Sequence, residues 1–545
     1  MYSSFYEPLH RIETDAVQAA HTKQSPQPLI AQVVLDGETC RTDDVYHIAH
    51  YPTQVQVAPA CWERVRLSRE MVNCMLARNE PIYGLNTGLG SLKKYALEPA
   101  ELEAFNRDVI LAHSVPLDTT PLSIPSVRAI MACRINGMVR GGSGVRPEIV
   151  QMLVDMLNLG VHPIVHGRSV SVGESDLSPM AEIGLVMIGD GRATYAGELL
   201  DGGEALRRAG LRPLTLHAKE ALGLISANAH STGCGALVVY ELKQIMLGFE
   251  YATALAFEAF RANLNVLNPH TVAARKFAGQ QISASNLRTL LHGSALFEAG
   301  TARNLQDPLS FRCAAQVLGT MRDTITYADQ VITAMLNSSV DSPLTLPEEG
   351  TLNSTGNFES TSLALVFDHL RLALHRLILM STQRLNKLLW HEFSDLPSAL
   401  NDDPHSHRLG MLYNNISRSA AALTAYAQTT ALPASLSYTP GITEGIDDYA
   451  SMAPVALNRT WTMLWVAQRS IILELLVASR ALTVLERQGR LHRLGTATAQ
   501  IYAWLETLKL EHAFDQGAGS LEHLARDFQL TTLIQIGGLG HAYPK

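Results

Sequence analysis

The sequence has few features of a secreted or membrane protein. Its six cysteines are scattered and form no Cys-x-x-Cys pair, which argues against a disulfide framework and favours reduced thiols. No stretch of about 18 residues is both apolar and free of charge; Glu474, for example, interrupts the apolar run 470–479. The first ten residues lack the basic flank and apolar segment of a secretory signal. We therefore expect a cytoplasmic protein without a membrane span.

An excess of basic residues is also absent. The chain has 43 Lys and Arg against 51 Asp and Glu, a net charge of −8, so it lacks the electrostatic footprint of a nucleic-acid-binding protein. Apolar residues make up 47% of the sequence, which excludes a mainly disordered chain. Its 545 residues allow three or four domains, or one large assembly.

The chain divides into three parts by composition. Residues 1–29 are polar and irregular, which predicts a poorly anchored tail. Residues 30–222 contain short mixed segments with many glycine and turn residues, and residues 223–545 contain long stretches with few helix breakers. We expect the second part to form an N-terminal region and the third to form a helix bundle with a C-terminal helical region.

Three stretches predict long helices. No Gly or Pro occurs between Gly356 and Pro397, and apolar residues recur there every three or four positions, which is the period of one helix face. The stretches from Val455 to Gln488 and from about Gly235 to Asn268 have a similar composition. Helices that are apolar over more than one face pack against each other and against partner chains. The sequence therefore predicts an all-α bundle that forms an oligomer.

No metal site is expected. His391-Glu392 begins like a zinc-protease motif, but position 395 is Asp where that motif needs a second His. His405 and His407 lie in a turn-rich polar stretch that is typical of a solvated loop.

Four segments resemble one known family. Residues 83–90 read YGLNTGLG, residues 306–313 read QDPLSFRC, residues 354–359 read STGNFE, and residues 171–179 read SVGESDLSP. They are similar, in the same order and with similar spacing, to YGxNTGFG, QDPYSLRC, GGNFHG and SVGASGDLAP of the aromatic amino acid lyases, the histidine, phenylalanine and tyrosine ammonia-lyases. The resemblance covers residues 31 to 540. It implies the ammonia-lyase fold, a homotetramer, and active sites built from more than one subunit.

One segment departs from the family at its most reactive point. Family members form an electrophile, methylidene-imidazolone (MIO), from an Ala-Ser-Gly tripeptide, and the Gly nitrogen attacks the Ala carbonyl. Here Glu174, Ser175 and Asp176 stand in that place, and one residue is missing. Gly suits the tight backbone geometry because it lacks a β-carbon. We therefore predict that the MIO cofactor does not form. Alternatively, the two acids cap a helix that begins near Leu177.

A missing electrophile favours a betaine as the small-molecule substrate. The electrophile works by capturing the lone pair of the substrate amine, and a trimethylammonium group has no lone pair. That group is already cationic and leaves as neutral trimethylamine. A member of the family eliminates trimethylamine from ergothioneine, the betaine of 2-thiolhistidine, to give thiolurocanate, and the sequence resembles that member. Glu174 and Asp176 would then face the trimethylammonium group.

The resemblance implies roles for two residues in the chemistry. Tyr83 matches the loop tyrosine that is proposed in the family to remove the β-proton, and a nearby substrate cation favours phenolate. Arg312 matches the arginine that binds the substrate carboxylate, which a guanidinium does through two parallel hydrogen bonds. An internal salt bridge is the alternative for Arg312.

The resemblance also implies substrate-binding residues. Asn357 matches the Asn of GGNFHG; the alternative is an Asn that only stabilises a turn. Glu359 replaces the family's His or Gln; the alternative is an acid on the surface. His113 aligns with a position that is His in members handling polar rings, and a buried core His is the alternative. Asp447 matches the acid near the imidazole in histidine ammonia-lyases. Two further residues fall near family positions: Asn414, near a ring-selectivity position, and Asn228, in the segment that replaces the family's NGT.

Two other functions stay open. A conventional histidine or aromatic amino acid ammonia-lyase with an unusual MIO-type electrophile would have an intact mass lower than that of the sequence by two waters. A non-catalytic paralogue would bind an aromatic metabolite without turnover. The sequence does not decide between ergothioneine and its sulfur-free analogue hercynine.

Overall fold

The computed structural model describes residues 32–78, 81–167, 176–403, 405, 407–437, 441, 443–508, 533 and 535. The expected N-terminal tail, residues 1–29, lies outside this part of the chain. All six cysteines lie within it as free thiols.

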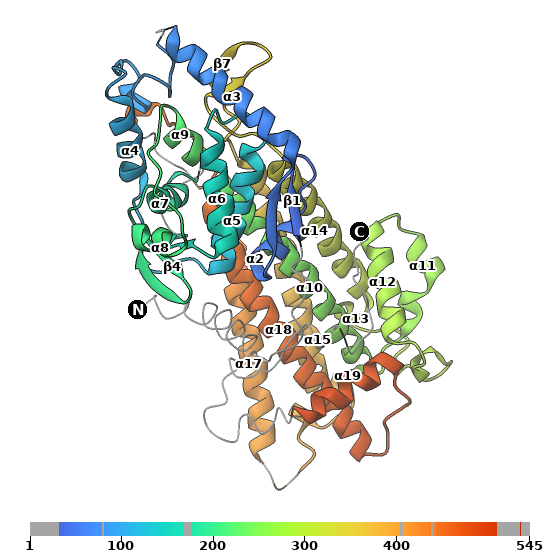
Figure 1. Cartoon of the computed structure of the whole chain (residues 1–545). Coiled ribbons are helices and arrows are strands. Elements are labelled where there is room, and N and C mark those ends of the chain that lie inside the picture. Colours follow the sequence, from blue (N-terminus) through green and yellow to red (C-terminus); the bar gives the residue numbers. More distant parts are fainter. Residues whose placement is uncertain are drawn as a thin grey trace.

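A bundle of five long helices forms the core of the molecule (Figure 1). They are α10 (Ala229–Phe260), α14 (Ala314–Leu336), α15 (Thr361–Leu389), α17 (His407–Thr430) and α18 (Ala453–Arg487). Side-chain contacts give their directions. Arg371 and Arg384 of α15 bind Ala456 and Glu474 of α18, so these two helices are parallel. The all-α fold class is confirmed.

Helices α14 and α17 run in the opposite direction. Arg371 near the start of α15 contacts Thr430 at the end of α17, and Asn386 near the end of α15 contacts Ser417 of α17, so α17 is antiparallel to α15. Arg322 of α14 pairs with Glu250 of α10, and a β-carbon at Gly235 of α10 would lie 3.3 Å from Ile332 of α14, so α14 is antiparallel to α10. The same β-carbon would lie 2.8 Å from Phe367 near the start of α15. The bundle therefore has two ends, and the N-termini of α10, α15 and α18 share one of them.

The apolar period of α15 is the pattern from which the sequence predicted this helix. Its Leu363, Phe367, Leu370, Leu374 and Leu377 are all buried. The predicted helix after Val455 is α18. The third helix was predicted at about residues 235–268, but α10 begins at Ala229 and ends at Phe260. It ends there because the next residue, Arg261, adopts a left-handed conformation with φ +57°.

Two segments are long and apolar enough to cross a membrane, Glu220–Phe260 and Ala453–Arg487. In both, most of the apolar window is buried inside the protein, at 94% and 83%. Core helices of a bundle have the same composition.

The N-terminal region packs on one end of the bundle (Figure 1). Its elements are β1 (Gln32–Leu35), α2 (Thr42–His50), β2 (Gln54–Val57), α3 (Pro59–Ala77), η2 (Gly90–Leu92), α4 (Leu102–His113), α5 (Ile124–Met138), α6 (Pro147–Leu159), β3 (His162–Pro163), α7 (Leu177–Met187), β4 (Arg192–Tyr195), β5 (Glu198–Asp201), α8 (Gly202–Arg208) and α9 (Glu220–Ile225). Strands β1 and β2 are parallel, and β3, β4 and β5 form a small antiparallel sheet.

Shorter elements connect and cover the long helices. They are η3 (Leu264–Leu267), α11 (Pro269–Ala273), α12 (Ala278–Leu290), η4 (Ala295–Phe297), α13 (Leu309–Arg312), β6 (Leu344–Leu346), β7 (Thr351–Asn353), α16 (His391–Ser394), η5 (Ser398–Leu400), η6 (Thr443–Gly445) and α19 (Thr496–Thr507). Strands β6 and β7 pair antiparallel.

A buried ion pair joins α15 to α18. Arg384 Nε lies 2.5 Å from Glu474 Oε1, and both side chains are almost fully buried. We expect Glu474→Gln to lower the free energy of unfolding by about 3–5 kcal/mol, because it leaves a buried guanidinium without its counter-charge. Thermal unfolding of this variant, compared with the double variant Arg384→Met with Glu474→Leu, measures the effect. The double variant should recover most of the stability, and equal losses in both would contradict the explanation.

Candidate active site

The loop that carries Tyr83 is tightly fixed. Gly84 has φ +71°, and a β-carbon there would lie 2.6 Å from Leu222 Cδ2 and 2.9 Å from Pro343 Cδ, so only Gly fits at this position. The side chain of Asn86 accepts a hydrogen bond from the Ile82 N–H at 2.8 Å. The Tyr83 hydroxyl accepts one from the Gly90 N–H at 3.3 Å. The tyrosine is therefore held in place before any substrate binds.

Two further loops lie beside the tyrosine loop. A β-carbon at Gly90 would lie 2.7 Å from Thr443, so η2 packs closely against η6. The loop after η6 is tied to the start of α15, because the Thr361 hydroxyl bonds the Tyr449 hydroxyl and the Ser360 hydroxyl bonds that of Ser451. One chain thus brings together the loops that carry Tyr83, Asn357, Glu359 and Asp447.

The acids and amide on these loops differ in their surroundings. Asp447 is half-buried, whereas Asn357 and Glu359 are exposed. The Glu359 carboxylate accepts a hydrogen bond from the Thr361 N–H at 2.6 Å and one from its hydroxyl. Glu359 thus caps the first turn of α15, where a negative charge is favourable.

His113, Asp176 and Asn228 form a second group at the same end. His113 is the last residue of α4, and its Nδ1 lies 2.7 Å from the Val109 carbonyl oxygen. The Val115 N–H donates to the Ser178 hydroxyl at 3.2 Å, which places the end of α4 beside the start of α7. Helix α9, which contacts the tyrosine loop through Leu222, leads directly into Asn228.

The carboxylate of Asp176 is buried and is bound to α10. Its two oxygens accept hydrogen bonds from the N–H and the hydroxyl of Ser231, at 2.7 and 3.0 Å. Helix α7 does begin at Leu177, but the Asp176 side chain does not cap it; it lies at the first turn of α10 instead. Burial raises the pKa of this carboxyl above its usual range, against the charge of His230 and the hydrogen bonds from Ser231.

Two nitrogens at the N-terminus of α10 have no partner. Asn228 Nδ2 and His230 Nδ1 are buried and form no hydrogen bond within the described residues. Burial lowers the pKa of His230, and the charge of Asp176 opposes this shift, so a neutral ring is favoured. His230 was not predicted from the sequence. The only available signal was its position two residues after Asn228.

Asp176, which stands where the family has the ring-forming glycine, also has a backbone nitrogen that is already hydrogen-bonded. Closure of the electrophile ring would require the Asp176 nitrogen to attack the Glu174 carbonyl carbon. That nitrogen donates its proton to the Ala227 carbonyl oxygen at 2.7 Å, and its side chain is anchored to Ser231. The contacts of Asp176 therefore do not suit the ring. Glu174 and Ser175 lie outside the described residues.

Arg312 and Asn414 lie at the other end of the bundle. Arg384 of α15 donates to the carbonyl oxygen of Ser310, two residues before Arg312, at 3.3 Å. Arg384 is about six helical turns, or about 35 Å, beyond Thr361. Asn414 lies on α17, one turn before Ser417, which bonds Asn386 at 2.7 Å. Figure 1 shows α13 well separated from α4 and α9. A single chain therefore does not bring these two residues to Tyr83.

Among the described residues, the guanidinium of Arg312 forms no ion pair with a carboxylate and no hydrogen bond. The side chain is half-buried at the end of α13. This leaves its two-pronged donor set available to a ligand.

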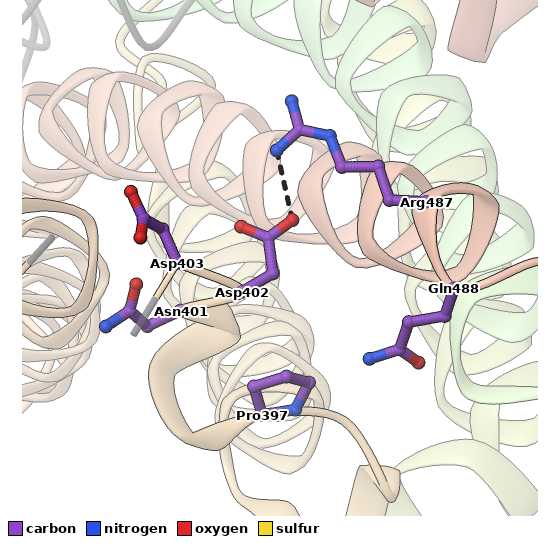
Figure 2. Close-up of a pocket in the computed structure, with 6 residues that line it drawn as sticks. All are labelled: Pro397, Asn401, Asp402, Asp403, Arg487 and Gln488. Atoms are coloured by element: carbon purple, nitrogen blue, oxygen red, sulfur yellow. Dashed lines mark hydrogen bonds and ion pairs between the residues drawn. The ribbon is translucent and has the colours of Figure 1, made fainter. Parts of the chain in front are cut away.

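A cavity elsewhere does not belong to this site. It has a volume of about 430 Å³ and is lined by Pro397, Asn401, Asp402, Asp403, Arg487 and Gln488. Figure 2 shows Arg487 bonded to Asp402 across it, at 3.0 Å. The described residues also contain no cluster of His, Cys, Asp and Glu that would hold a metal ion.

Comparison with known proteins identifies the family. A family model for aromatic amino acid lyases matches residues 40–507. Histidine ammonia-lyase from Caldanaerobacter subterraneus subsp. tengcongensis is 33% identical over 86% of this chain and 91% of its own length. That of Gloeobacter violaceus is 36% identical over 85% and 90%. The chain belongs to the aromatic amino acid lyase family and is a carbon–nitrogen lyase.

Solved structures of the same fold include enzymes with different substrates. Ergothionase from Treponema denticola, in complex with desmethyl-ergothioneine sulfonic acid, superposes with a TM-score of 0.83 at 28% identity and covers 93% of this chain and 98% of its own. Histidine ammonia-lyase from Trypanosoma cruzi has a TM-score of 0.81 at 26% identity, covering 94% and 98%. The ammonia-lyase fold expected from the sequence is confirmed.

The raised pKa of Asp176 predicts a pH dependence of stability. A carboxyl with a folded pKa above its unfolded value of 3.8 binds more protons in the folded state between these two values. The carboxyl therefore contributes to the free energy of unfolding below pH 3.8, and this contribution is lost as the pH rises through the pKa of the folded state. We expect the Tm of the wild type to fall relative to that of Asp176→Asn across this window. A Tm difference that does not change with pH would contradict this assignment.

Proposed function

We propose that this chain eliminates trimethylamine from ergothioneine and gives thiolurocanate, without an MIO cofactor. The observation that carries the proposal is the place of Asp176, whose backbone nitrogen is bound to Ala227 and whose carboxylate is anchored to α10. A loop held in this way does not suit the ring, and a trimethylammonium leaving group does not need it. The similarity to the ergothionase from Treponema denticola supports the same conclusion.

The reaction is a β-elimination. The Tyr83 oxygen takes the proton from the β-carbon, and the electrons of that C–H bond form the double bond to the α-carbon. The electrons of the bond between the α-carbon and nitrogen leave with trimethylamine, so no acid is needed for the leaving group. Arg312 binds the carboxylate, and Tyr83 is held by the Gly90 N–H for this step.

The same end of the bundle carries the proposed binding residues. The N-termini of α10, α15 and α18 converge there and would disfavour a cation. Asp176 and Glu359 supply negative charge at two of these termini, and Glu174 would add a third acid next to the trimethylammonium group. The remaining proposed contacts with the ring and carboxylate are His113, Asn228, Asn357, Asn414 and Asp447. Ser175, which lies outside the described residues, is a further proposed contact.

A site of this kind needs a second copy of the chain. Arg312 and Asn414 lie near the C-terminal end of α15, whereas the Tyr83 loop lies near its N-terminal end, about 35 Å away along the helix. Exposed apolar residues on the outside of the bundle, among them Leu365, Leu372 and Met411, suit contact with such copies. We propose a cytoplasmic homotetramer in which one subunit supplies Tyr83 and another supplies Arg312.

The identity to histidine ammonia-lyases favours a second candidate, ammonia release from histidine through an electrophile. Proton NMR of the enzyme with ergothioneine, hercynine and histidine in separate tubes distinguishes the two. The first proposal predicts a trimethylamine singlet with ergothioneine and unchanged histidine. Conversion of histidine to urocanate with no change in either betaine would contradict it. Ligand-induced thermal shifts without turnover of any of the three compounds would indicate a non-catalytic paralogue.

A further inference from the structure

Three arginine side chains gather at the C-terminal end of α10. Arg490 Nη2 lies 2.6 Å from Asp395 Oδ2, and Arg261 Nη2 lies 3.6 Å from the same oxygen. Arg303 is held next to them, because its backbone N–H donates to the Arg261 carbonyl oxygen at 2.9 Å. Its guanidinium covers the ring of Phe260, with the guanidinium carbon 4.7 Å from the ring centroid. One carboxylate thus faces three cations.

The charges in this cluster do not balance. The second acid nearby is Asp307, whose oxygens already accept hydrogen bonds from two asparagine residues. Counting both acids, the cluster keeps one positive charge in excess. Burial lowers the pKa values of Arg261 and Arg303, and the neighbouring arginines lower them further. The arrangement is therefore short of negative charge.

One nitrogen in each of two guanidinium groups has no hydrogen-bond acceptor among the described residues. Arg261 Nη2 and Arg303 Nε are buried and have no hydrogen-bond partner in the described residues. The 3.6 Å separation between Arg261 and Asp395 is too long for a hydrogen bond. Buried charged donors without acceptors are destabilising. The side chains of Asp395 and Arg490 are 58% and 34% exposed, so the cluster is open to a ligand from solvent.

We propose that Arg261, Arg303 and Arg490 bind a small oxyanion, a phosphate or a carboxylate group. Planar guanidinium groups match the oxygens of both in pairs. The favourable interaction of arginines with the C-terminal end of a helix is a competing explanation, but it leaves the Arg303 Nε without an acceptor. The neighbouring cavity of Figure 2 does not suit the anion, because Asp402 and Asp403 line it. This site lies at the same end of the bundle as Arg312, because Phe260 stacks on Phe311 with the ring centroids 4.0 Å apart, but it uses none of the residues proposed for the elimination.

Thermal unfolding of the intact protein tests the site. The probes are inorganic phosphate and acetate, each compared with chloride at equal ionic strength. Phosphate at a hundred times its dissociation constant should raise the Tm by about 2 °C, and acetate by less if a doubly charged oxyanion is preferred. Arg303→Gln should lose most of the shift. Arg493→Gln is the matched control, because Arg493 pairs with Glu298 at 2.5 Å outside the cluster, and it should keep the full shift.

Three results would overturn the proposal. The first is a wild-type Tm that phosphate and acetate change no more than chloride does. The second is an equal shift in wild type and Arg303→Gln; if that variant does not fold, the more exposed Arg490→Gln takes its place with the same criterion. The third is loss of the native oligomeric state in Arg303→Gln with no anion effect in the wild type, which would assign the cluster to a carboxylate of a neighbouring subunit.

Discussion

Tyr83→Phe is expected to lower kcat for trimethylamine release by about 10²–10⁴-fold, the usual contribution of a positioned general base. The variant keeps the ring of the side chain, and the loop keeps its fold, because Gly84 and Asn86 hold it through contacts that do not involve the hydroxyl. Substrate binding should therefore change little. Steady-state assays of trimethylamine release measure kcat, and titration of the variant with ergothioneine measures binding.

The matched control for this prediction is Tyr195→Phe, a half-buried tyrosine on β4 away from the tyrosine loop. It loses a hydroxyl of the same kind and should keep full activity. If Tyr83→Phe retained more than about a tenth of the wild-type kcat, another group would be the base, and the assignment of Tyr83 would be wrong.

Arg312→Gln is expected to lower kcat/KM for ergothioneine by about 10²-fold or more, because it removes two charge-assisted hydrogen bonds to the carboxylate, each worth ~1.5–3 kcal/mol. Arg312→Lys keeps the positive charge but not the paired geometry of the guanidinium. Its kcat/KM should therefore lie between those of the wild type and Arg312→Gln. No described acid loses its partner in either variant, so the Tm should change little. A lowered Tm with unchanged kcat/KM would indicate a structural role instead.

The distance between Arg312 and Tyr83 makes a second experiment possible. If one subunit supplies the base and another the arginine, mixed tetramers of Tyr83→Phe and Arg312→Gln contain some sites with both native residues. Random assembly from equal amounts would give about a quarter of the wild-type sites. Co-expression of the two inactive variants should therefore restore activity. The same variants, mixed after separate purification and without subunit exchange, serve as the control and should stay inactive. Inactive co-expressed tetramers would contradict a shared site.

Local patterns predicted much of the bundle. The helix period at Leu363 to Leu377 and the breaker-free stretch after Val455 placed α15 and α18 within a few residues. The start of α10 was not predicted, because it depends on a contact distant in sequence: the Asp176 carboxylate binds the Ser231 N–H in the first turn. No periodicity of residues 229–260 contains that information.

The candidate site was only partly accessible from the sequence for the same reason. Family motifs located Tyr83 and Arg312, and the structure then placed them at opposite ends of α15, which no motif reports. The interpretation of Asp176 as a cap for α7 chose the helix that follows it in sequence, whereas the fold brings α10 closer to its carboxylate. His230 has no pattern of its own and is recognised only through its buried, unpartnered nitrogen.

The central claim is that the carbon–nitrogen bond breaks without a ring made from the chain itself. Mass spectrometry of the intact protein, on the sample that is releasing trimethylamine from ergothioneine, tests this most directly. We expect the mass of the encoded sequence, with both waters of the Glu174–Asp176 segment retained. An active protein lighter by two waters would contradict it.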